Sequence, residues 1–189
     1  AVAEEMGRRL VRSSFSPNIK ERRDCSTAIF AADGRLVAQA AHIPIHLGSL
    51  FGAVEAVAGK FPLERMLPGD AFIANDAYLC GGTHLNDISI IQPVFVDGIV
   101  QYFTACIGHH TDVGGPTPGS IAPDAASIFE EGIRIPATQV VRAGEIDRGL
   151  IELIAHNTRE PEIRILDLDV QIAVASFGAA RLADLAVSE

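Results

Sequence analysis

The dipeptide Asp97-Gly98 constrains the fold of this chain more than any other feature, because strand-like runs flank it on both sides. The runs cover residues 88–96 and 99–107 and are rich in β-branched and aromatic residues. Asp-Gly is a preferred pair for a type I′ turn, in which both central residues need a positive φ. The sequence therefore predicts an antiparallel hairpin centred on this pair, with Pro93 marking an edge strand or a β-bulge.

A second pair, Asp33-Gly34, predicts another hairpin over residues 25–39 with the same type of turn. Residues 71–74 are typical of a short buried strand. Apolar residues at helical spacing predict helices over residues 1–15, 46–60, 145–158 and 161–187. Strands joined in hairpins and flanked by helices favour the α+β class over a doubly wound parallel sheet.

Composition limits the classes of protein to which the chain can belong. The 189 residues carry a formal net charge of −9, which argues against nucleic-acid binding, since that needs clustered Lys and Arg. No apolar run reaches the ~18 residues of a membrane-spanning helix. Three cysteines without a CxxC pair do not form the framework of a secreted disulfide protein, so we expect a cytoplasmic protein with no membrane contact.

Three of the six histidines fall in two short segments, which lie at the open ends of the central hairpin. One segment carries His84 and Asp87, and the other carries His109. Directly opposed residues of a hairpin have Cβ atoms about 5 Å apart, so these side chains come within reach of one ion. Two imidazoles and a carboxylate suit a divalent transition metal such as Zn²⁺, Mn²⁺ or Fe²⁺.

The simplest register of the hairpin does not bring all three side chains to one face of the sheet. If Val96 pairs with Ile99, Asn86 lies opposite His109, and Asp87 points to the other face of the sheet. A bulge near Pro93, or an irregular approach through the glycines before His84, has to break the alternation. The alternative interpretation is that the histidines only cap strand ends and that the aspartates form turns.

A second polar group lies at the open end of the first hairpin. It contains Asp24, His42 and His46, and the two histidines could share one face of a helix. Pro44 lies between them and weakens a regular helix there, so a structural role or a pocket wall is favoured over metal binding. Arg22 and Arg23 are candidate clamps for an anionic substrate or phosphate, with a solvated or helix-paired role as the favoured alternative.

Several motifs together resemble one family, hydantoinase B/oxoprolinase. They are residues 16–24 (SPNIKERRD), 33–39 (DGRLVAQ), 42–48 (HIPIHLG), 68–70 (PGD), 75–78 (NDAY), 81–87 (GGTHLND) and 108–115 (GHHTDVGG). The family includes B subunits of N-methylhydantoinases, the matching half of 5-oxoprolinase, and subunits of acetone and acetophenone carboxylases. Its members are much longer, so residues 1–189 are expected to form an N-terminal portion, as a single domain or a fragment of a larger subunit.

The resemblance implies a division of labour within a hetero-oligomer. A partner of the hydantoinase A type uses ATP to phosphorylate a small-molecule substrate, and the B-type subunit completes the opening of a cyclic amide ring. In the carboxylases a divalent metal is held by a His-x-x-Asp pair and a later His, which match His84, Asp87 and His109. The remaining alternatives are a carboxylase-type subunit and a non-catalytic docking scaffold.

The same resemblance suggests roles for the residues around the three metal ligands. His110 and Asp112 are candidate catalytic groups that transfer protons or orient the ligands. Asp24 and His46 are expected to border the substrate pocket, and Arg22 or Arg23 is expected to meet a phosphorylated intermediate.

Overall fold

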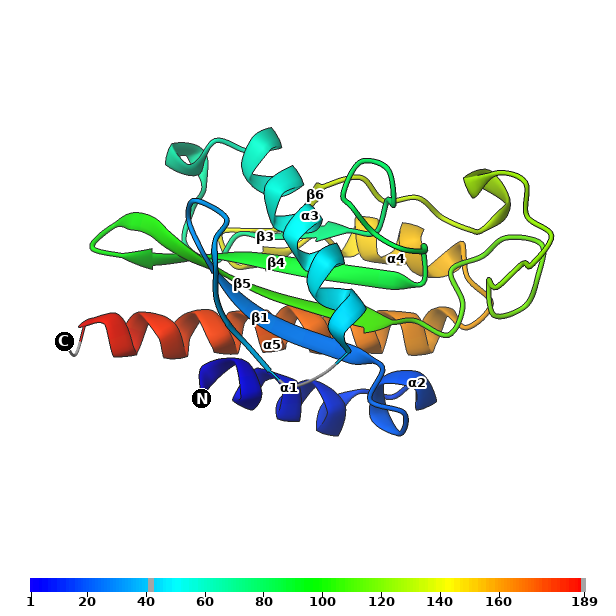
Figure 1. Ribbon diagram of the computed structural model, residues 1–189, viewed down its shortest axis with the longest axis horizontal. Helices are drawn as coiled ribbons and strands as arrows, with labels where there is room; N and C mark the ends of the chain where they lie inside the picture. The colour runs from blue at the N-terminus through cyan, green and yellow to red at the C-terminus, as the bar shows by residue number, and fades with distance from the viewer. Residues whose placement is uncertain (41–42, 188–189) are drawn as a thin grey trace.

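The computed structural model describes residues 1–40 and 43–187 as a helix-covered antiparallel sheet (Figure 1). Within those residues the sheet has seven strands in the order β2-β1-β5-β4-β3-β6-β7, and every neighbouring pair is antiparallel. The α+β class predicted from the sequence is therefore confirmed. The strands are β1 Cys25–Ala31, β2 Leu36–Gln39, β3 Ala71–Ala74, β4 Asp87–Val96, β5 Ile99–His109, β6 Thr138–Arg142 and β7 Glu145–Ile146.

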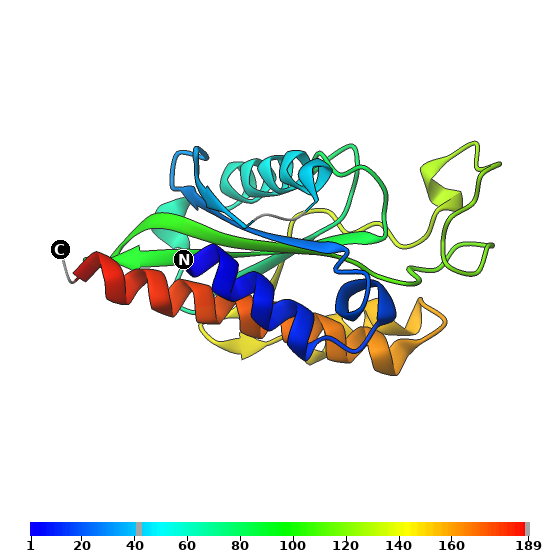
Figure 2. The ribbon, with the colours of Figure 1, turned by 60° about the horizontal axis from the view of Figure 1, so that its bottom comes forward.

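The helices cover both faces of the sheet, as Figure 2 shows. Helix α3 lies on one face, whereas α1 and the long α5 lie side by side on the other. None of the helices in the described part of the chain has the length and apolar character needed to cross a bilayer. The helices are α1 Val2–Ser13, α2 Pro17–Lys20, α3 Pro44–Lys60, α4 Arg148–His156 and α5 Pro161–Val187, with 3₁₀ turns η1 Leu63–Arg65 and η2 Ile128–Glu130.

Two hydrophobic clusters fill the spaces on either side of the sheet. Alternate residues of a strand point to opposite faces, so Ile29 joins the cluster beneath α1 and α5, and Phe30 joins the one beneath α3. Ile90 and Ile91 of the central strand β4 divide in the same way. Because both faces are covered, β4 is buried along almost its whole length rather than alternating between apolar and polar residues.

Helix boundaries follow the local signals in the sequence. Helix α5 spans Pro161–Val187, as predicted, with proline at its first position. The predicted helix over 145–158 is wrong in its first residues, because Glu145–Ile146 forms the edge strand β7 and Asp147 then caps α4 by accepting from the Leu150 N–H at 2.9 Å. Helix α3 starts at Pro44, where a proline is tolerated because the first turn needs no N–H donor.

The two Asp-Gly turns differ from each other. Asp97 and Gly98 have φ of 53° and 80°, which confirms the type I′ turn of the central hairpin. In the first hairpin only Gly34 has a positive φ, at 85°, and its N–H donates to the Ala31 carbonyl. The type I′ turn predicted at Asp33-Gly34 is therefore wrong, because the turn begins one residue earlier and leaves only the glycine in the left-handed region.

A bulge sets the register of the central hairpin. Val96 pairs with Ile99 as predicted, but the pairing shifts between Val94 and Phe95, which face Tyr102 and Val100. Gln101 is thus an extra residue in β5, as in a β-bulge. Pro93 lies directly before the shift, so the bulge alternative is confirmed. Strand β4 is an interior strand rather than an edge strand, although its pairs with β3 run only from Ser89 to Ile91 and end before Pro93.

The close contact between α3 and the loop after β3 gives a testable prediction. A Cβ on Gly52 would lie 2.5 Å from the Cys80 carbonyl oxygen and 2.7 Å from the Gly81 Cα, and neither backbone atom can move alone. Gly52→Ala should therefore destabilise the fold by about 1–3 kcal/mol in urea unfolding. Gly48→Ala in the same helix meets nothing within 4 Å and should stabilise it slightly. Equal unfolding free energies for the two variants would contradict this contact.

Candidate metal centre

Three neighbouring strands bring polar side chains to one end of the sheet. Asp87, the first residue of β4, lies directly opposite His109, the last residue of β5. On the other side of β5, the His109 N–H donates to the Asp24 carbonyl at 2.9 Å, just before β1 begins. Directly opposed positions in a sheet project their side chains to the same face. The register thus gathers two carboxylates around one imidazole.

His84 completes this group from the loop before β4. Its Nε2 lies 3.0 Å from Asp87 Oδ2, and His109 Nδ1 lies 3.2 Å from Asp87 Oδ1. The two imidazole rings are 4.8 Å apart between centroids. One potential ligand atom from each of His84, Asp87 and His109 lies within 4.8 Å of the other two, which is the spacing needed to share a single ion. The structure therefore brings together the three residues predicted as metal ligands.

The first turn of α3 adds a third imidazole to the group. His46 Nε2 lies 3.5 Å from Asp24 Oδ1 and 3.6 Å from Asp87 Oδ2. Its other nitrogen, Nδ1, lies 3.1 Å from Ser26 Oγ, and this contact fixes the orientation of the ring. The two residues predicted to border the pocket, Asp24 and His46, thus contact the predicted metal ligands, whereas His42 lies outside the described residues.

Asn75 and Thr83, which both precede β4, hold the loop that carries His84. Asn75 donates to the Leu85 carbonyl at 2.7 Å and accepts from the Ile135 N–H at 2.7 Å, which ties the loop to the segment before β6. Thr83 Oγ1 donates to Asp87 Oδ2 at 3.2 Å. Thr83 and Ser26 are not among the residues that the sequence predicts for the site. The only available signal was their position, four residues before Asp87 and two residues after Asp24.

The surroundings of the cluster shift the pKa values of its members in opposite directions. Burial would raise the pKa of Asp87, but hydrogen bonds from His109 and His84 outweigh it and hold this pKa below its usual value. The hydrogen bond with Asp87 raises the pKa of His84. Burial lowers the pKa of His46 more than the two carboxylates raise it, so His46 is neutral at pH 7. The site therefore holds an ionised carboxylate beside a neutral imidazole.

The donor set fits a divalent transition metal. Asp87 is 3% exposed, and its ion-pair contacts among the described residues are with His46, His84 and His109 rather than with Lys or Arg. Asp87 is thus a buried carboxylate whose ion-pair partners are imidazoles, and these carry no permanent positive charge that would balance it. Two imidazole nitrogens and a carboxylate oxygen are common ligands of Zn²⁺, Mn²⁺ and Fe²⁺, and three protein ligands leave room for water or substrate.

The structure does not bring His110 to this cluster. As the neighbour of His109, it points to the opposite face of the sheet, where its Nε2 lies 2.7 Å from Gln171 Oε1 and its Nδ1 contacts Arg164. His110 is fully buried, and burial together with the Arg164 charge lowers its pKa well below the usual value. A neutral histidine enclosed by α5 supports the strand end, and this position does not support its predicted role in proton transfer at the cluster.

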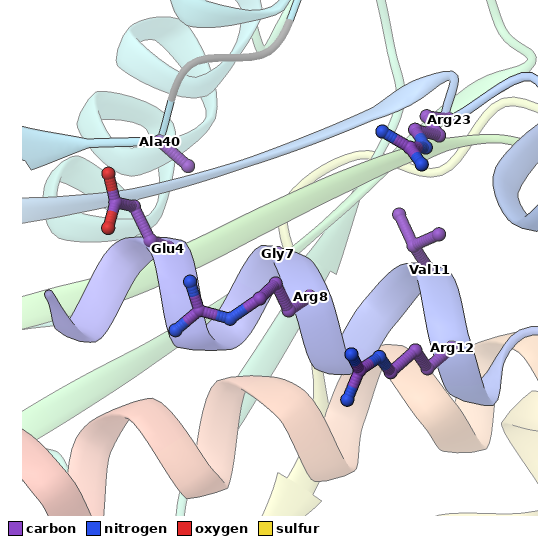
Figure 3. A pocket seen from close by; sticks show the side chains of 7 residues that line it. All are labelled: Glu4, Gly7, Arg8, Val11, Arg12, Arg23 and Ala40. Atoms are coloured by element: carbon purple, nitrogen blue, oxygen red, sulfur yellow. The ribbon is translucent and has the colours of Figure 1, made fainter.

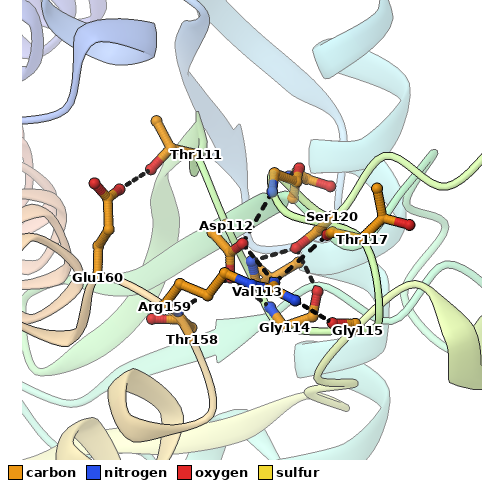
Figure 4. Close-up of polar contacts among 12 residues, drawn as sticks. Thr111, Asp112, Val113, Gly114, Gly115, Thr117, Ser120, Thr158, Arg159 and Glu160 are labelled. Atoms are coloured by element: carbon orange, nitrogen blue, oxygen red, sulfur yellow. Dashed lines mark hydrogen bonds and ion pairs between the residues drawn. The ribbon is translucent and has the colours of Figure 1, made fainter.

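Asp112 also lies in a network of its own, which Figure 4 shows. Its carboxylate accepts from the N–H groups of Gly114 and Gly119 at 2.9 and 3.0 Å and pairs with Arg159 at 2.8 Å. Burial alone would raise the pKa of Asp112, but these hydrogen bonds outweigh it and hold this pKa below its usual value, so the carboxylate stays ionised. These contacts fix the glycine-rich loop to the start of α5 and leave Asp112 outside the cluster. Arg22 is exposed in the turn after α2, so its predicted contact with substrate remains a prediction.

The profile of the hydantoinase B/oxoprolinase family matches residues 1–188, so the chain belongs to that family. Among its relatives, 5-oxoprolinase 1 of Arabidopsis thaliana is 40% identical over 196 residues, covering 97% of this chain and 15% of that protein. The caprolactamase subunit beta of Pseudomonas jessenii is 37% identical over 182 residues, covering 96% of this chain and 31% of that protein.

Solved structures agree with this assignment. The crystal structure of the ATP-dependent caprolactamase from Pseudomonas jessenii superimposes with a TM-score of 0.88 at 36% identity, over 97% of this chain and 31% of that one. A nucleotide-free acetone carboxylase structure superimposes with a TM-score of 0.91 over 100% of this chain and 25% of that one, at 21% identity, which shows the common fold. The chain spans a third or less of the length of these relatives.

The opposed pKa shifts predict how stability depends on pH in metal-free protein. The ionised Asp87 stabilises the fold above its unfolded pKa of about 3.9, and that stabilisation is lost as pH falls through its lower folded value. Protonated His84 stabilises the fold below about pH 6.5, and this is lost as pH rises through its raised pKa. Asp87→Asn should therefore cost roughly 1.5–3 kcal/mol at pH 5.5 and distinctly less at pH 9.

Urea unfolding in the presence of a chelator measures this difference. Asp124→Asn, which changes an exposed carboxylate, is the control and should cost nothing measurable at either pH. A cost of Asp87→Asn that is the same at both pH values would contradict the charge pairing described above.

Proposed function

We propose that this chain carries the metal-binding site of an ATP-coupled amidohydrolase subunit that opens cyclic amide rings. The observation that supports this most is the convergence of His84, Asp87 and His109, with Asp24 and His46 beside them, in a member of the hydantoinase B/oxoprolinase family. Relatives of the chain include proteins named 5-oxoprolinase and caprolactamase, and the solved caprolactamase is described as ATP-dependent.

In this proposal His84, Asp87 and His109 hold a divalent metal, which when bound acts as a Lewis acid toward a carbonyl or phosphoryl oxygen. Thr83 donates to Asp87 Oδ2 and orients the carboxylate. Asp87 and His109 lie opposite each other at the paired ends of β4 and β5. The sheet register therefore fixes these two side chains relative to each other and makes the pocket rigid.

His46 and Asp24 are the residues that would handle protons and substrate. His46 is neutral at pH 7, so its Nε2 can accept a proton from water or substrate, and Ser26 keeps the ring oriented. The Asp24 side chain is 30% exposed, in contrast to the buried Asp87, so it lies at the side of the cluster that solvent can reach. Asp24 is therefore the carboxylate available to accept a hydrogen bond from a substrate N–H.

We further propose that an ATP-using partner of the hydantoinase A type activates the substrate and that the two subunits form a hetero-oligomer. The caprolactamase relative is itself described as a subunit beta, which supports an assembly of different chains. The three cysteines are free and buried, as in proteins of the reducing cytoplasm. The short length of the chain relative to its relatives is consistent with a contribution from further residues to the complete pocket.

Metal content tests the ligand assignment. Purified protein should bind close to one equivalent of Mn²⁺ or Zn²⁺, and His109→Ala should weaken binding by about a hundredfold or more, since it removes a direct ligand. The matched control is His156→Ala, because His156 is exposed at the end of α4. His110→Ala should also retain the ion, since His110 lies on the other face of the sheet. Metal content undiminished in His109→Ala would remove the proposed site.

Activity tests the reaction. The full-length protein with its ATP-binding partner should hydrolyse ATP and open a cyclic amide such as a hydantoin, 5-oxoproline or caprolactam. Ring opening should fall by about a hundredfold or more in Asp87→Asn. Product formation only in the presence of bicarbonate, with a carboxylated product, would assign the site to carboxylation instead. Full activity in Asp87→Asn would leave the chain as a docking scaffold and contradict the proposal.

A further inference from the structure

A second candidate site lies on the opposite side of β1 from the cluster, along α1. It is a groove of about 500 Å³ between α1, the turn after α2 and the end of β2. The groove includes none of the five residues of the candidate metal centre. Figure 3 shows its lining, which consists of Glu4, Gly7, Arg8, Val11, Arg12, Arg23 and Ala40.

The groove concentrates positive charge on an acidic protein. The chain carries a net charge of −9, yet three of the seven lining residues are arginines and only Glu4 is acidic. Arg8 and Arg12 are one helical turn apart, a spacing at which like charges destabilise a helix. Glu4, one turn before Arg8, offsets part of that repulsion, and an anion bound between the two arginines would reduce it further.

A third arginine, Arg23, lines the same groove from the turn after α2. Arg23 has a φ of 57°, which residues with side chains rarely adopt, and the Asp24 N–H holds the turn by donating to the Asn18 carbonyl at 2.9 Å. In Figure 3 Arg23 lies across the groove from α1, near Val11. The neighbouring Arg9 points elsewhere, because its guanidinium lies 3.7 Å over the Phe177 ring of α5.

We propose that this groove binds a phosphorylated small molecule, with the phosphate held by Arg8, Arg12 and Arg23. Guanidinium groups match the oxygens of a phosphate in pairs, and three of them suit a dianion better than a single carboxylate. The volume falls within the range of small-molecule pockets. Glu4, at the end of the groove away from Arg23, accepts a hydrogen bond from a ligand hydroxyl. This inference does not depend on the proposed metal site.

Calorimetric titration of the full chain with inorganic phosphate and with glycerol phosphate tests the proposal, at low ionic strength and after removal of metal. Both probes should bind saturably, and glycerol phosphate should bind more tightly because its hydroxyls reach Glu4. The double variant Arg8→Gln/Arg12→Gln should bind both at least tenfold more weakly. Arg9→Gln removes one positive charge from the same helix outside the groove and should bind them as the unaltered protein does, and circular dichroism should show all variants folded.

Three results would overturn the proposal. The first is the absence of saturable phosphate binding to the unaltered, folded protein. The second is equal weakening in Arg9→Gln and in Arg8→Gln/Arg12→Gln, which would indicate a general effect of charge. The third is binding of polyglutamate without binding of either phosphate probe, which would assign the groove to an acidic polypeptide. Failure of the metal site is a separate result, because His84→Ala should leave phosphate binding unchanged.

Discussion

The arrangement of the candidate metal centre depends on one extra residue in β5. Up to Val100 the hairpin follows the register set by its turn, and beyond Gln101 each residue of β5 is shifted by one position against β4. A one-residue shift moves every side chain of a strand to the other face relative to its partner. The bulge therefore places Asp87 opposite His109, where a regular hairpin would place Asn86 and would leave the carboxylate on the far side of the sheet.

Much of this architecture could be predicted from local signals in the sequence. The Asp97-Gly98 turn and the long final helix depend on short-range patterns. The hairpin and the family motifs together predict the grouping of His84, Asp87 and His109, but they do not predict the register that produces it. The position of the bulge could be predicted only approximately, from Pro93. Which strand acquires the extra residue is decided by packing on both faces of the sheet, and no local pattern records that.

The parts that sequence analysis missed involve contacts between distant segments. The sequence predicts His110 as a candidate catalytic group beside His109, but its partners Gln171 and Arg164 lie on α5, more than fifty residues later. Strand β6 likewise joins the sheet through its pairing with the distant strand β3, and the edge strand β7 then pairs with β6. Sequence motifs identify such histidines as candidate site residues, whereas the alternation of side chains along a strand decides which of them share a site.

Anomalous X-ray scattering from crystals of the protein grown with Mn²⁺ tests the central claim most directly. The account predicts one strong peak at about 2.0–2.3 Å from His84 Nε2, an Asp87 carboxylate oxygen and His109 Nδ1, with Asp24 and His46 around it. A peak coordinated by other residues, or no peak at this end of the sheet at saturating Mn²⁺, would contradict it.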